Sequence, residues 1–314
     1  MNFIIKVKQM TRRFLGGFIG YCLILFGFTK RAKEQILSVS NITPIYFHNP
    51  SKQLFERCIQ WLKGNGFTFI STDQLVDILR GRMDAPRGAT WITFDDGWKE
   101  NISNVIPIIE KFNIPVTFFI STEPVENVGS FWWTIAQRYK EHLPLPYRKD
   151  VSMLWKIEEH KRRSLLDGLK KIYSGESVRE AMTVQDVKDI ANLPQITIGC
   201  HTVNHVATPN CTSTELEFEI SASKATIENW IGKEVKYFAY PGGKYDGRER
   251  MILEKFGIVL SATIEKRHIS HDDDLYFIPR FSVMDKGYFS EAVCRMLGVF
   301  NPFISIGRKI GMAP

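Results

Sequence analysis

Short apolar segments alternate along the chain with longer segments in which apolar residues recur every three or four positions. The short segments are rich in β-branched and aromatic residues, which is typical of strands, and the longer ones have the period of amphipathic helices. The expected strands are residues 42–47, 67–70, 89–94, 116–120, 195–200, 236–240, 258–263 and 277–283. The expected helices are residues 51–64, 72–79, 104–112, 214–230 and 247–256. Strands separated by helices predict parallel pairing through right-handed crossovers.

Some eight strands in this rhythm predict an α/β fold, a (β/α) barrel, with a doubly wound open sheet as the alternative. Residues 131–193 interrupt the alternation, because they are rich in charge and in helix formers and end in the amphipathic stretch MTVQDVKDIANL. We therefore expect a helical insert at about residues 130–193. No linker rich in Pro, Gly or Ser divides the chain, so the expected organisation is an N-terminal segment, residues 1–40, followed by one domain, residues 41–314.

The charge of the chain is concentrated at its N-terminus. The 314 residues carry a net charge of +7, but residues 1–33 hold seven basic residues and no acidic one, which leaves 34 of each sign in the remainder. A balanced folded part does not favour a nucleic-acid partner. The five cysteines are irregularly spaced and form no C-x-x-C pair, so they are expected to be free thiols, as in a reducing compartment.

An apolar run of 15 residues, 14–28, lies between the two basic clusters of this N-terminal segment. The run is shorter than the roughly 20 residues that a spanning helix needs. It also lacks the small-residue cleavage site of a signal peptide. Basic flanks on both sides favour a segment lying on an anionic membrane surface. A helix buried against the domain and a short membrane span are the alternatives.

Two adjacent carboxylates, Asp95 and Asp96, follow the strand-like run of the stretch ATWITFDDGWK. Neighbouring side chains of a strand point to opposite faces, so one carboxylate is free to bind a cation while the other transfers protons. The competing interpretation is a simple Asp-Asp-Gly turn. In a parallel barrel the carboxyl ends of strands form the active site, which is where this pair is expected.

A second polar constellation, His201 and His205, follows the predicted strand 195–200 in ITIGCHTVNH. Two imidazoles four residues apart can reach one cation, and with Asp96 they form a typical ligand set for catalytic zinc. The protease pattern H-E-x-x-H does not apply, because Thr202 stands where the glutamate would be. A non-haem iron site uses the same ligand types, but it has no need of a base beside its metal ligand, as Asp95 would provide.

Three motifs, TFDDG at 93–97, HTVNH at 201–205 and AYPGG at 239–243, each follow a predicted strand and together resemble the polysaccharide deacetylases (carbohydrate esterase family 4). The resemblance extends over about residues 42–285 and implies a distorted, partly open (β/α) barrel of seven to eight strands. By motif position it implies that Asp95 is the catalytic base. Asp96, His201 and His205 would then bind a divalent metal, most simply Zn²⁺.

The resemblance also assigns roles around the third motif. The backbone N–H of Gly242 matches an oxyanion donor, although most members carry an aromatic residue there, and Tyr240 and Pro241 are candidates for substrate contact. Ala239 stands where many members have an arginine, and Arg280 in IPR is expected to orient Asp95 instead.

The general acid of the family is not recognisable, because the late Leu-x-His motif is absent. His268 and His271 lie in about that region, and both are interpreted as loop residues. His48, directly after the first strand, is the better-placed candidate for substrate contact or proton donation.

These observations predict a metal-dependent hydrolase that removes N-acetyl groups from the amino sugars of a polysaccharide or a glycan precursor. The alternative is a carbohydrate-binding or assembly module that kept the fold and lost catalysis. Basic residues on both sides of the apolar run oppose export, so we expect a membrane-associated protein at the cytoplasmic face, with an extracytoplasmic location as the alternative.

Overall fold

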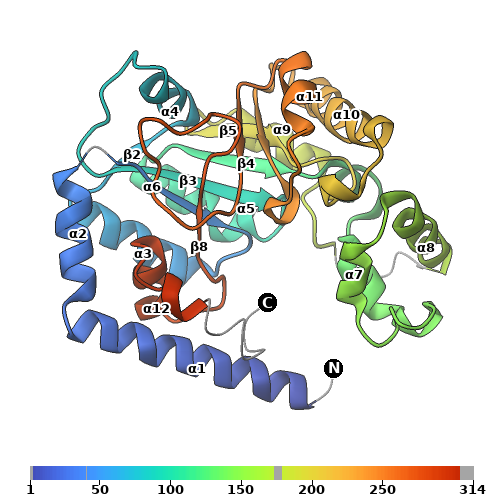
Figure 1. Cartoon of the computed structure of the whole chain (residues 1–314), viewed down its shortest axis with the longest axis horizontal. Helices are drawn as coiled ribbons and strands as arrows, with labels where there is room; N and C mark the ends of the chain where they lie inside the picture. Colours follow the sequence, from blue (N-terminus) through green and yellow to red (C-terminus); the bar gives the residue numbers. More distant parts are fainter. Residues whose placement is uncertain (1–2, 40, 173–178, 305–314) are drawn as a thin grey trace.

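The computed structural model describes residues 3–39, 41–172 and 179–304, and its centre is one curved sheet of eight parallel strands (Figure 1). All eight predicted strands are present. They are β1 (Thr43–Phe47), β2 (Thr68–Ile70), β3 (Ala89–Asp96), β4 (Val116–Ile120), β5 (Ile196–Cys200), β6 (Tyr237–Ala239), β7 (Leu260–Ala262) and β8 (Phe281–Ser282).

The strands follow the order β7-β6-β5-β4-β3-β1-β8, and β2 pairs with the first half of β3. Every ladder is parallel, and an isolated bridge between Ala262 and Ile278 brings the segment before β8 back to β7. The sheet thus curls round without a continuous closing ladder. The predicted distorted, partly open barrel is confirmed, and the doubly wound alternative is wrong.

Helices cover the outside of the sheet, as the alternating pattern requires. They are α3 (Lys52–Gly64), α4 (Thr72–Leu79), α5 (Asn101–Asn104), α6 (Ile106–Phe112), α9 (Val184–Ala191), α10 (Ser213–Ile231), α11 (Glu249–Lys255) and α12 (Phe289–Met296). The helix expected at 104–112 is split after Asn104. Pro107 in the first turn of α6 lacks an N–H and starts a new helix there.

A row of aromatic rings joins the sheet to these helices. Phe47, Phe94 and Phe118 stand on neighbouring strands with ring centroids 5.6 Å and 4.8 Å apart, and Phe55 of α3 packs edge-on against the first two. All four side chains are fully buried. This core fixes the strands whose carboxyl ends carry the polar motifs.

The helical insert stands off one edge of the barrel, on the side where β3, β4 and β5 end (Figure 1). It contains α7 (Trp132–Arg138), short 3₁₀ helices at Lys140–His142 and Val151–Lys156, and α8 (Glu159–Ile172), with a small core of its own. By contrast, α9 packs on α10 and β5 and belongs to the barrel. The described part of the chain leaves out residue 40, where the domain boundary was expected, residues 173–178 of the insert and residues 305–314.

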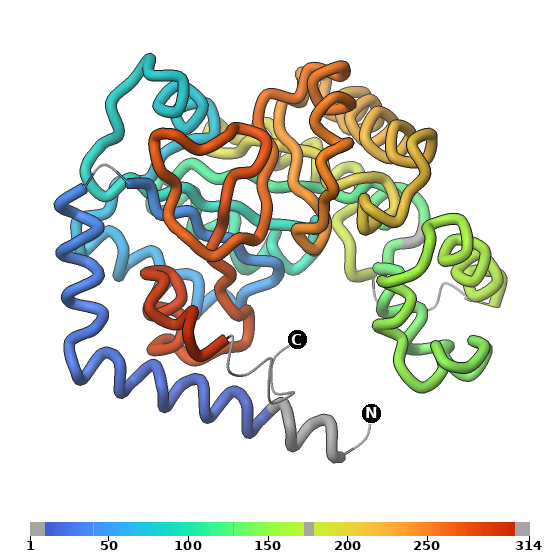
Figure 2. The backbone as a smooth tube through the Cα atoms, viewed as in Figure 1, coloured from blue at the N-terminus to red at the C-terminus, as the bar shows by residue number. Residues whose placement is uncertain are grey.

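The N-terminal segment forms two helices, α1 (Phe3–Leu25) and α2 (Phe28–Ser38), which turn at Gly27 with φ 78°. α1 runs along α12, as Figure 2 shows. The two backbones are close, because a Cβ added at Gly20 would lie 2.6 Å from the backbone N of Glu291. Among the described residues no single helix is long and apolar enough to cross a membrane. The segments Met10–Leu25 and Phe28–Ser38 reach that length and hydropathy only when they are taken together, and the pair is bent by 68°.

The other face of α1 is exposed and apolar. Phe14, Phe18, Tyr21 and Leu25 share this face by their spacing, and their exposed fractions lie between 57% and 69%. The segment is therefore only partly the buried helix that one alternative expected.

Candidate active site

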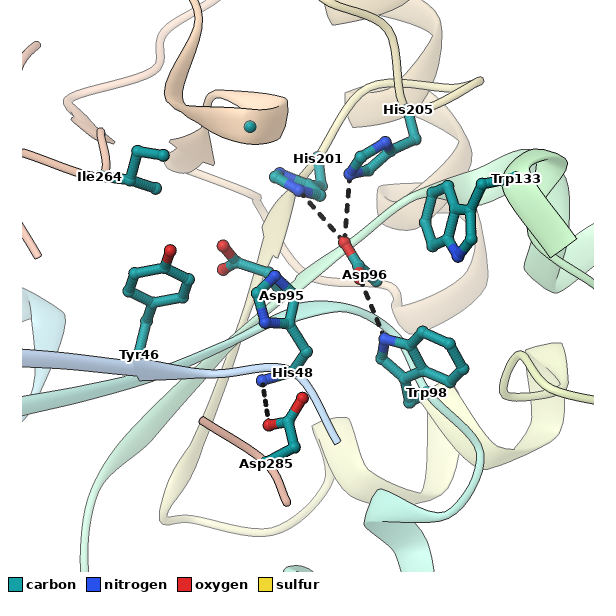
Figure 3. Close-up of a pocket in the computed structure, with 11 residues that line it drawn as sticks. Tyr46, His48, Asp95, Asp96, Trp98, Trp133, His201, His205, Ile264 and Asp285 are labelled. Atoms are coloured by element: carbon teal, nitrogen blue, oxygen red, sulfur yellow. Dashed lines mark hydrogen bonds and ion pairs between the residues drawn. The ribbon is translucent and has the colours of Figure 1, made fainter. Parts of the chain in front are cut away.

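The carboxyl ends of the strands surround a pocket of about 320 Å³ that collects most of the predicted site residues (Figure 3). Its wall comes from β1, β3, helix α7 of the insert and the segments that follow β1, β3, β5, β6, β7 and β8. It is lined by Tyr46, His48, Asp95, Asp96, Trp98, Trp133, His201, His205, Gly242, Ile264 and Asp285.

Asp95 and Asp96 belong to β3 itself, where they pair with Phe119 and Ile120 of β4. The ladder with β4 carries β3 two residues further than expected, and the turn that the alternative interpretation predicted begins only at Gly97, which has φ 91°. A regular strand would send the two carboxylates to opposite faces. Asp96 has φ 77°, which breaks the alternation, so both side chains line the pocket.

Asp96, His201 and His205 converge on one point. The Nε2 atoms of His201 and His205 lie 3.4 Å and 3.2 Å from Asp96 Oδ1, and one potential ligand atom from each residue lies within 4.8 Å of the others. Asp96 Oδ1 is buried and has no hydrogen-bond partner among the described residues. Such an orphaned oxygen facing two imidazole nitrogens fits a bound divalent cation.

The protonation states suit metal binding. Burial raises the pKa of Asp96, but the nearby imidazoles outweigh burial and hold this pKa well below its usual range. Burial lowers the pKa of His205, which favours the neutral imidazole with a free lone pair. His201 Nδ1 lies 2.7 Å from the carbonyl oxygen of Ala239, and this bond directs Nε2 to the cluster.

The loop that carries the two histidines is strained and held from two sides. Thr202 and His205 have φ of 64° and 49°, a region that residues other than glycine rarely adopt. On one side, the buried carboxylate of Glu219 in α10 accepts hydrogen bonds from the backbone N–H groups of Val203 and Asn204, both at 2.9 Å.

The insert holds the same loop from the other side. Arg162 of α8 donates to the carbonyl oxygens of His205 and Asn204 at 3.2 Å and 3.3 Å, and Trp132 of α7 donates to that of His205 at 3.3 Å. Arg162 is itself buried and bonded to Glu159. The insert thus helps to position a candidate metal ligand.

Asp95 is held by Arg280 in a two-pronged ion pair. The guanidinium donates from Nη1 to Oδ1 at 2.7 Å and from Nη2 to Oδ2 at 2.8 Å, and both side chains are buried. Arg280 also donates to Thr93 Oγ1 and to the carbonyl oxygen of Thr263, and lies over the ring of Tyr46. A carboxylate has about four lone-pair positions, so Asp95 keeps acceptor capacity toward the pocket.

His48 lies on the pocket wall at the end of β1, and its backbone N–H donates to Asp285 Oδ1 at 3.2 Å (Figure 3). Burial lowers the pKa of His48, but the carboxylates of Asp96, Asp285 and Asp95 outweigh it and raise the pKa overall. His48 is therefore a pocket residue whose protonated form is stabilised by its surroundings.

The third motif contributes only Gly242 to the pocket. Pro241 is buried outside the lining, and the buried hydroxyl of Tyr240 donates to the carbonyl oxygen of Tyr276, away from the pocket. Contrary to expectation, Tyr240 and Pro241 are thus not placed to contact a substrate in this pocket. His268 packs against Phe281 and His271 is exposed, so neither reaches the pocket.

Sequence reasoning missed three polar residues of the site. Trp98 donates from its indole to Asp96 Oδ2 at 2.9 Å, and its place directly after the DDG motif was the signal. Glu219 lies on the buried face of helix α10, where a carboxylate is unusual. Asp285 carries no local signal, because only the fold brings it to β1.

Comparisons with known proteins agree with the geometry. Residues 82–261 match the family model for polysaccharide deacetylases. The chain is 22% identical over 254 residues to a putative polysaccharide deacetylase, YxkH, of Bacillus subtilis, covering 81% of this chain and 72% of that protein. It is also 22% identical over 253 residues to the poly-β-1,6-N-acetyl-D-glucosamine N-deacetylase of Staphylococcus aureus, covering 78% and 74%.

A solved structure shows the same fold. The deacetylase PplD of Streptococcus pyogenes, in complex with acetate, superposes with a TM-score of 0.60 at 16% identity, covering 82% of this chain and 98% of that one. The family match spans more than half of the present sequence. This protein therefore belongs to the polysaccharide deacetylases, hydrolases of the amide carbon–nitrogen bond.

Proposed function

We propose that the protein is a divalent-metal-dependent N-deacetylase that acts on a glycan containing N-acetylated amino sugars. The observation that carries the proposal is the convergence of Asp96, His201 and His205 beside a buried Asp95 in one pocket. The staphylococcal relative, an N-deacetylase of poly-N-acetylglucosamine, supports this substrate class.

The chemistry requires a better nucleophile and a better electrophile than water and an amide provide. A bound Zn²⁺ would lower the pKa of water to about 7 and polarise the acetyl carbonyl. Asp95 accepts the proton of the attacking water, and Arg280 keeps its carboxylate in one orientation. The backbone N–H of Gly242 is available to the developing oxyanion, a contribution commonly worth about 10²–10³ in rate.

The leaving amine must gain a proton when the carbon–nitrogen bond breaks. Two groups on the pocket wall can supply it, namely Asp95, which has just accepted one, and His48, whose imidazole lines the same pocket. The products are acetate and a free amino sugar, so one water molecule is consumed for each acetyl group removed. A His48→Gln variant with unchanged kcat would leave Asp95 as the donor.

A metal analysis combined with an acetate assay tests this function. The purified full chain should bind one zinc ion at the three-residue cluster and release acetate from β-1,4- or β-1,6-linked N-acetylglucosamine pentamers. The non-catalytic alternative predicts oligosaccharide binding without acetate release. A chain that binds no stoichiometric metal, or that binds metal but releases no acetate from either pentamer, would contradict the proposal.

We also propose that α1 holds the protein on the cytoplasmic surface of a membrane. Its exposed apolar face supports this, because Phe14, Phe18 and Tyr21 have no cover among the described residues. Arg13, Lys30 and Arg31 are exposed at the two ends of this face, where anionic lipid headgroups would attract them. The substrate would then be a lipid-linked or nascent glycan.

Fractionation of cells that express the full chain tests this location. The protein should be in the membrane fraction and be released by high salt, which screens charges beyond about 10 Å at 0.1 M. A Phe14→Ser/Phe18→Ser variant should be found in the soluble fraction. Both substitutions lie on the exposed face of α1, so they leave the contact between α1 and α12 intact. Digestion of the catalytic domain by protease added to intact spheroplasts would place it outside the cell and refute the assignment.

A further inference from the structure

A second cavity, of about 660 Å³, opens beside the catalytic pocket. Trp133, His205 and Gly242 line both cavities, so the two lie side by side and share these residues as a common border. The rest of the second cavity comes from the insert, from α7 and the segment up to Trp155. A substrate longer than one sugar would therefore extend from the pocket onto the insert.

Trp155 forms the aromatic surface where the two cavities meet. Its ring stacks on Trp132 at 5.8 Å with 8° between the planes, and the Arg162 guanidinium lies 4.7 Å from the centre of the Trp132 ring. The backbone is also fixed, since Asn210 donates to the carbonyl oxygen of Trp155 at 3.0 Å. The ring is thus held in one orientation, with the His205 ring 5.2 Å away between centroids, and it is half-buried.

Gly242 makes room for this ring. A Cβ added at Gly242 would lie 2.8 Å from Trp155 Cζ2, and Gly242 has φ 58°. Any larger residue would displace the indole. In this chain the aromatic surface beside the oxyanion position is therefore provided by the insert, and not by the residue at position 242.

The cavity is also positively charged. Lys140, Arg148 and Lys149 line it, against a single carboxylate, Asp150, which is bonded to the backbone N–H of Ser152 at 3.0 Å. In the described part of the chain none of the three cations forms an ion pair. Arg148 donates from Nε to the carbonyl oxygen of Leu143 at 3.1 Å, and Arg148 and Lys149 are exposed. An anionic group of a glycan could form ion pairs with these cations, which a neutral glycan cannot do.

We infer that the insert cavity binds the part of the glycan next to the acetylated sugar, with a sugar ring on Trp155 and an anionic group of the same glycan at Lys140, Arg148 and Lys149. The apolar C–H face of a pyranose matches the electron-rich face of an indole. The anionic group is a phosphate or a carboxylate, which the same cations would bind. This inference rests on the proposed function, because it extends the substrate of that site.

Binding measurements with three probes test the inference. Calorimetry on the zinc-loaded full chain at low salt would compare neutral N-acetylchitohexaose with a hyaluronan hexasaccharide, which carries carboxylates, and with UDP-N-acetylglucosamine, which carries phosphates. At least one anionic probe should bind about tenfold more tightly than the neutral one, a difference of about 1.4 kcal/mol. Which anionic probe binds identifies the anionic group.

Variants of the cavity connect this preference to its residues. Lys140→Gln/Lys149→Gln should abolish the advantage of the anionic probe, whereas Lys156→Gln, an exposed lysine outside the lining, should retain it. Trp155→Ala should weaken all probes, and Trp155→Phe should restore part of the affinity with an unchanged melting temperature.

Equal binding of all three probes by the wild type would overturn the inference, as would an anionic preference that survives loss of both lysines. Acetate release is measured separately. A chain that prefers the anionic probe but releases no acetate would refute the proposed function and leave the inferred glycan binding by the cavity standing. Failure of the proposed function can therefore be told apart from failure of this inference.

Discussion

Replacing Glu219 by glutamine should loosen the loop that carries His205. Glu219 Oε2 accepts the two backbone N–H groups of Val203 and Asn204, and Oε1 accepts Asn204 Nδ2 at 2.7 Å and Arg163 Nη2 at 3.0 Å. Glutamine exchanges one oxygen for an NH₂ group. Whichever way the amide is turned, two of these four donors lose their acceptor.

The size of the effect follows from these bonds. A hydrogen bond to a charged group contributes about 1.5–3 kcal/mol, so two lost bonds at the lower end amount to about 3 kcal/mol. The loop can avoid part of this loss by relaxing, because Thr202 and His205 are strained at positive φ. This relaxation moves His205. Loss of a contact that positions a metal ligand, as Glu219 does here through the loop, typically lowers metal affinity about 10–100-fold.

The assay is zinc competition against a chelator, together with thermal unfolding of the metal-free protein, at pH 8. The alkaline pH is chosen because burial raises the pKa of Glu219, although its bonds with Asn204 favour the ionised form. Glu217→Gln is the matched control, since it makes the same chemical change on α10 and removes only a surface pair with Lys255. Wild-type zinc affinity and stability in Glu219→Gln would show that Glu219 does not hold the loop of His205 in place.

Three further predictions concern other parts of the molecule. Arg280→Lys should lower kcat at least tenfold with little change in zinc content, because lysine cannot form both bonds to Asp95, and a loss of about 1.4 kcal/mol is tenfold in rate; near-normal kcat would show that Arg280 is only structural. Ellman's reagent at pH 8 should modify one thiol of the native chain, Cys22, because the other four are buried with raised pKa values, to about 12 for Cys58; rapid reaction of two or more would contradict this burial. Gly20→Leu should separate α1 from α12 and expose α1 to trypsin, whereas Phe18→Leu on the exposed face should not; equal resistance of both variants would rule out the close α1–α12 contact.

The strands and the main candidate ligands could be predicted because their signals are local. Each strand is an apolar run bounded by polar residues; Asp96 ends one such run, His201 directly follows another, and His205 lies in the loop after it. Parallel pairing then brings the carboxyl ends together without further information. Arg280 was also expected near Asp95, but through the family resemblance and not through any local pattern.

The residues that support the site could not be found in this way. Asp285 and His48 are far apart in the sequence, and only the pairing of β1 with β8 brings them together. The contact between Trp155 and Gly242 depends on the three-dimensional packing, which no pattern in the sequence of the insert indicates.

The N-terminal segment shows the same limit in another form. Its apolar run predicted a membrane surface helix, a buried helix or a short span as separate alternatives. In the structure one face of α1 packs on α12 through small residues such as Gly20, and the opposite face is exposed. Because the partner helix comes from the other end of the chain, the run alone did not reveal this division.

The proposed function assigns different roles to the two adjacent carboxylates: Asp95 transfers protons, and Asp96 helps to bind the metal. Zinc content and acetate release of purified Asp95→Asn and Asp96→Asn variants, each checked for a folded state by thermal unfolding, test it most directly. We expect that Asp95→Asn keeps one zinc ion per chain and loses nearly all acetate release, whereas Asp96→Asn loses both. Equal loss of zinc from the two variants, or acetate release by Asp95→Asn at the wild-type rate, would contradict it.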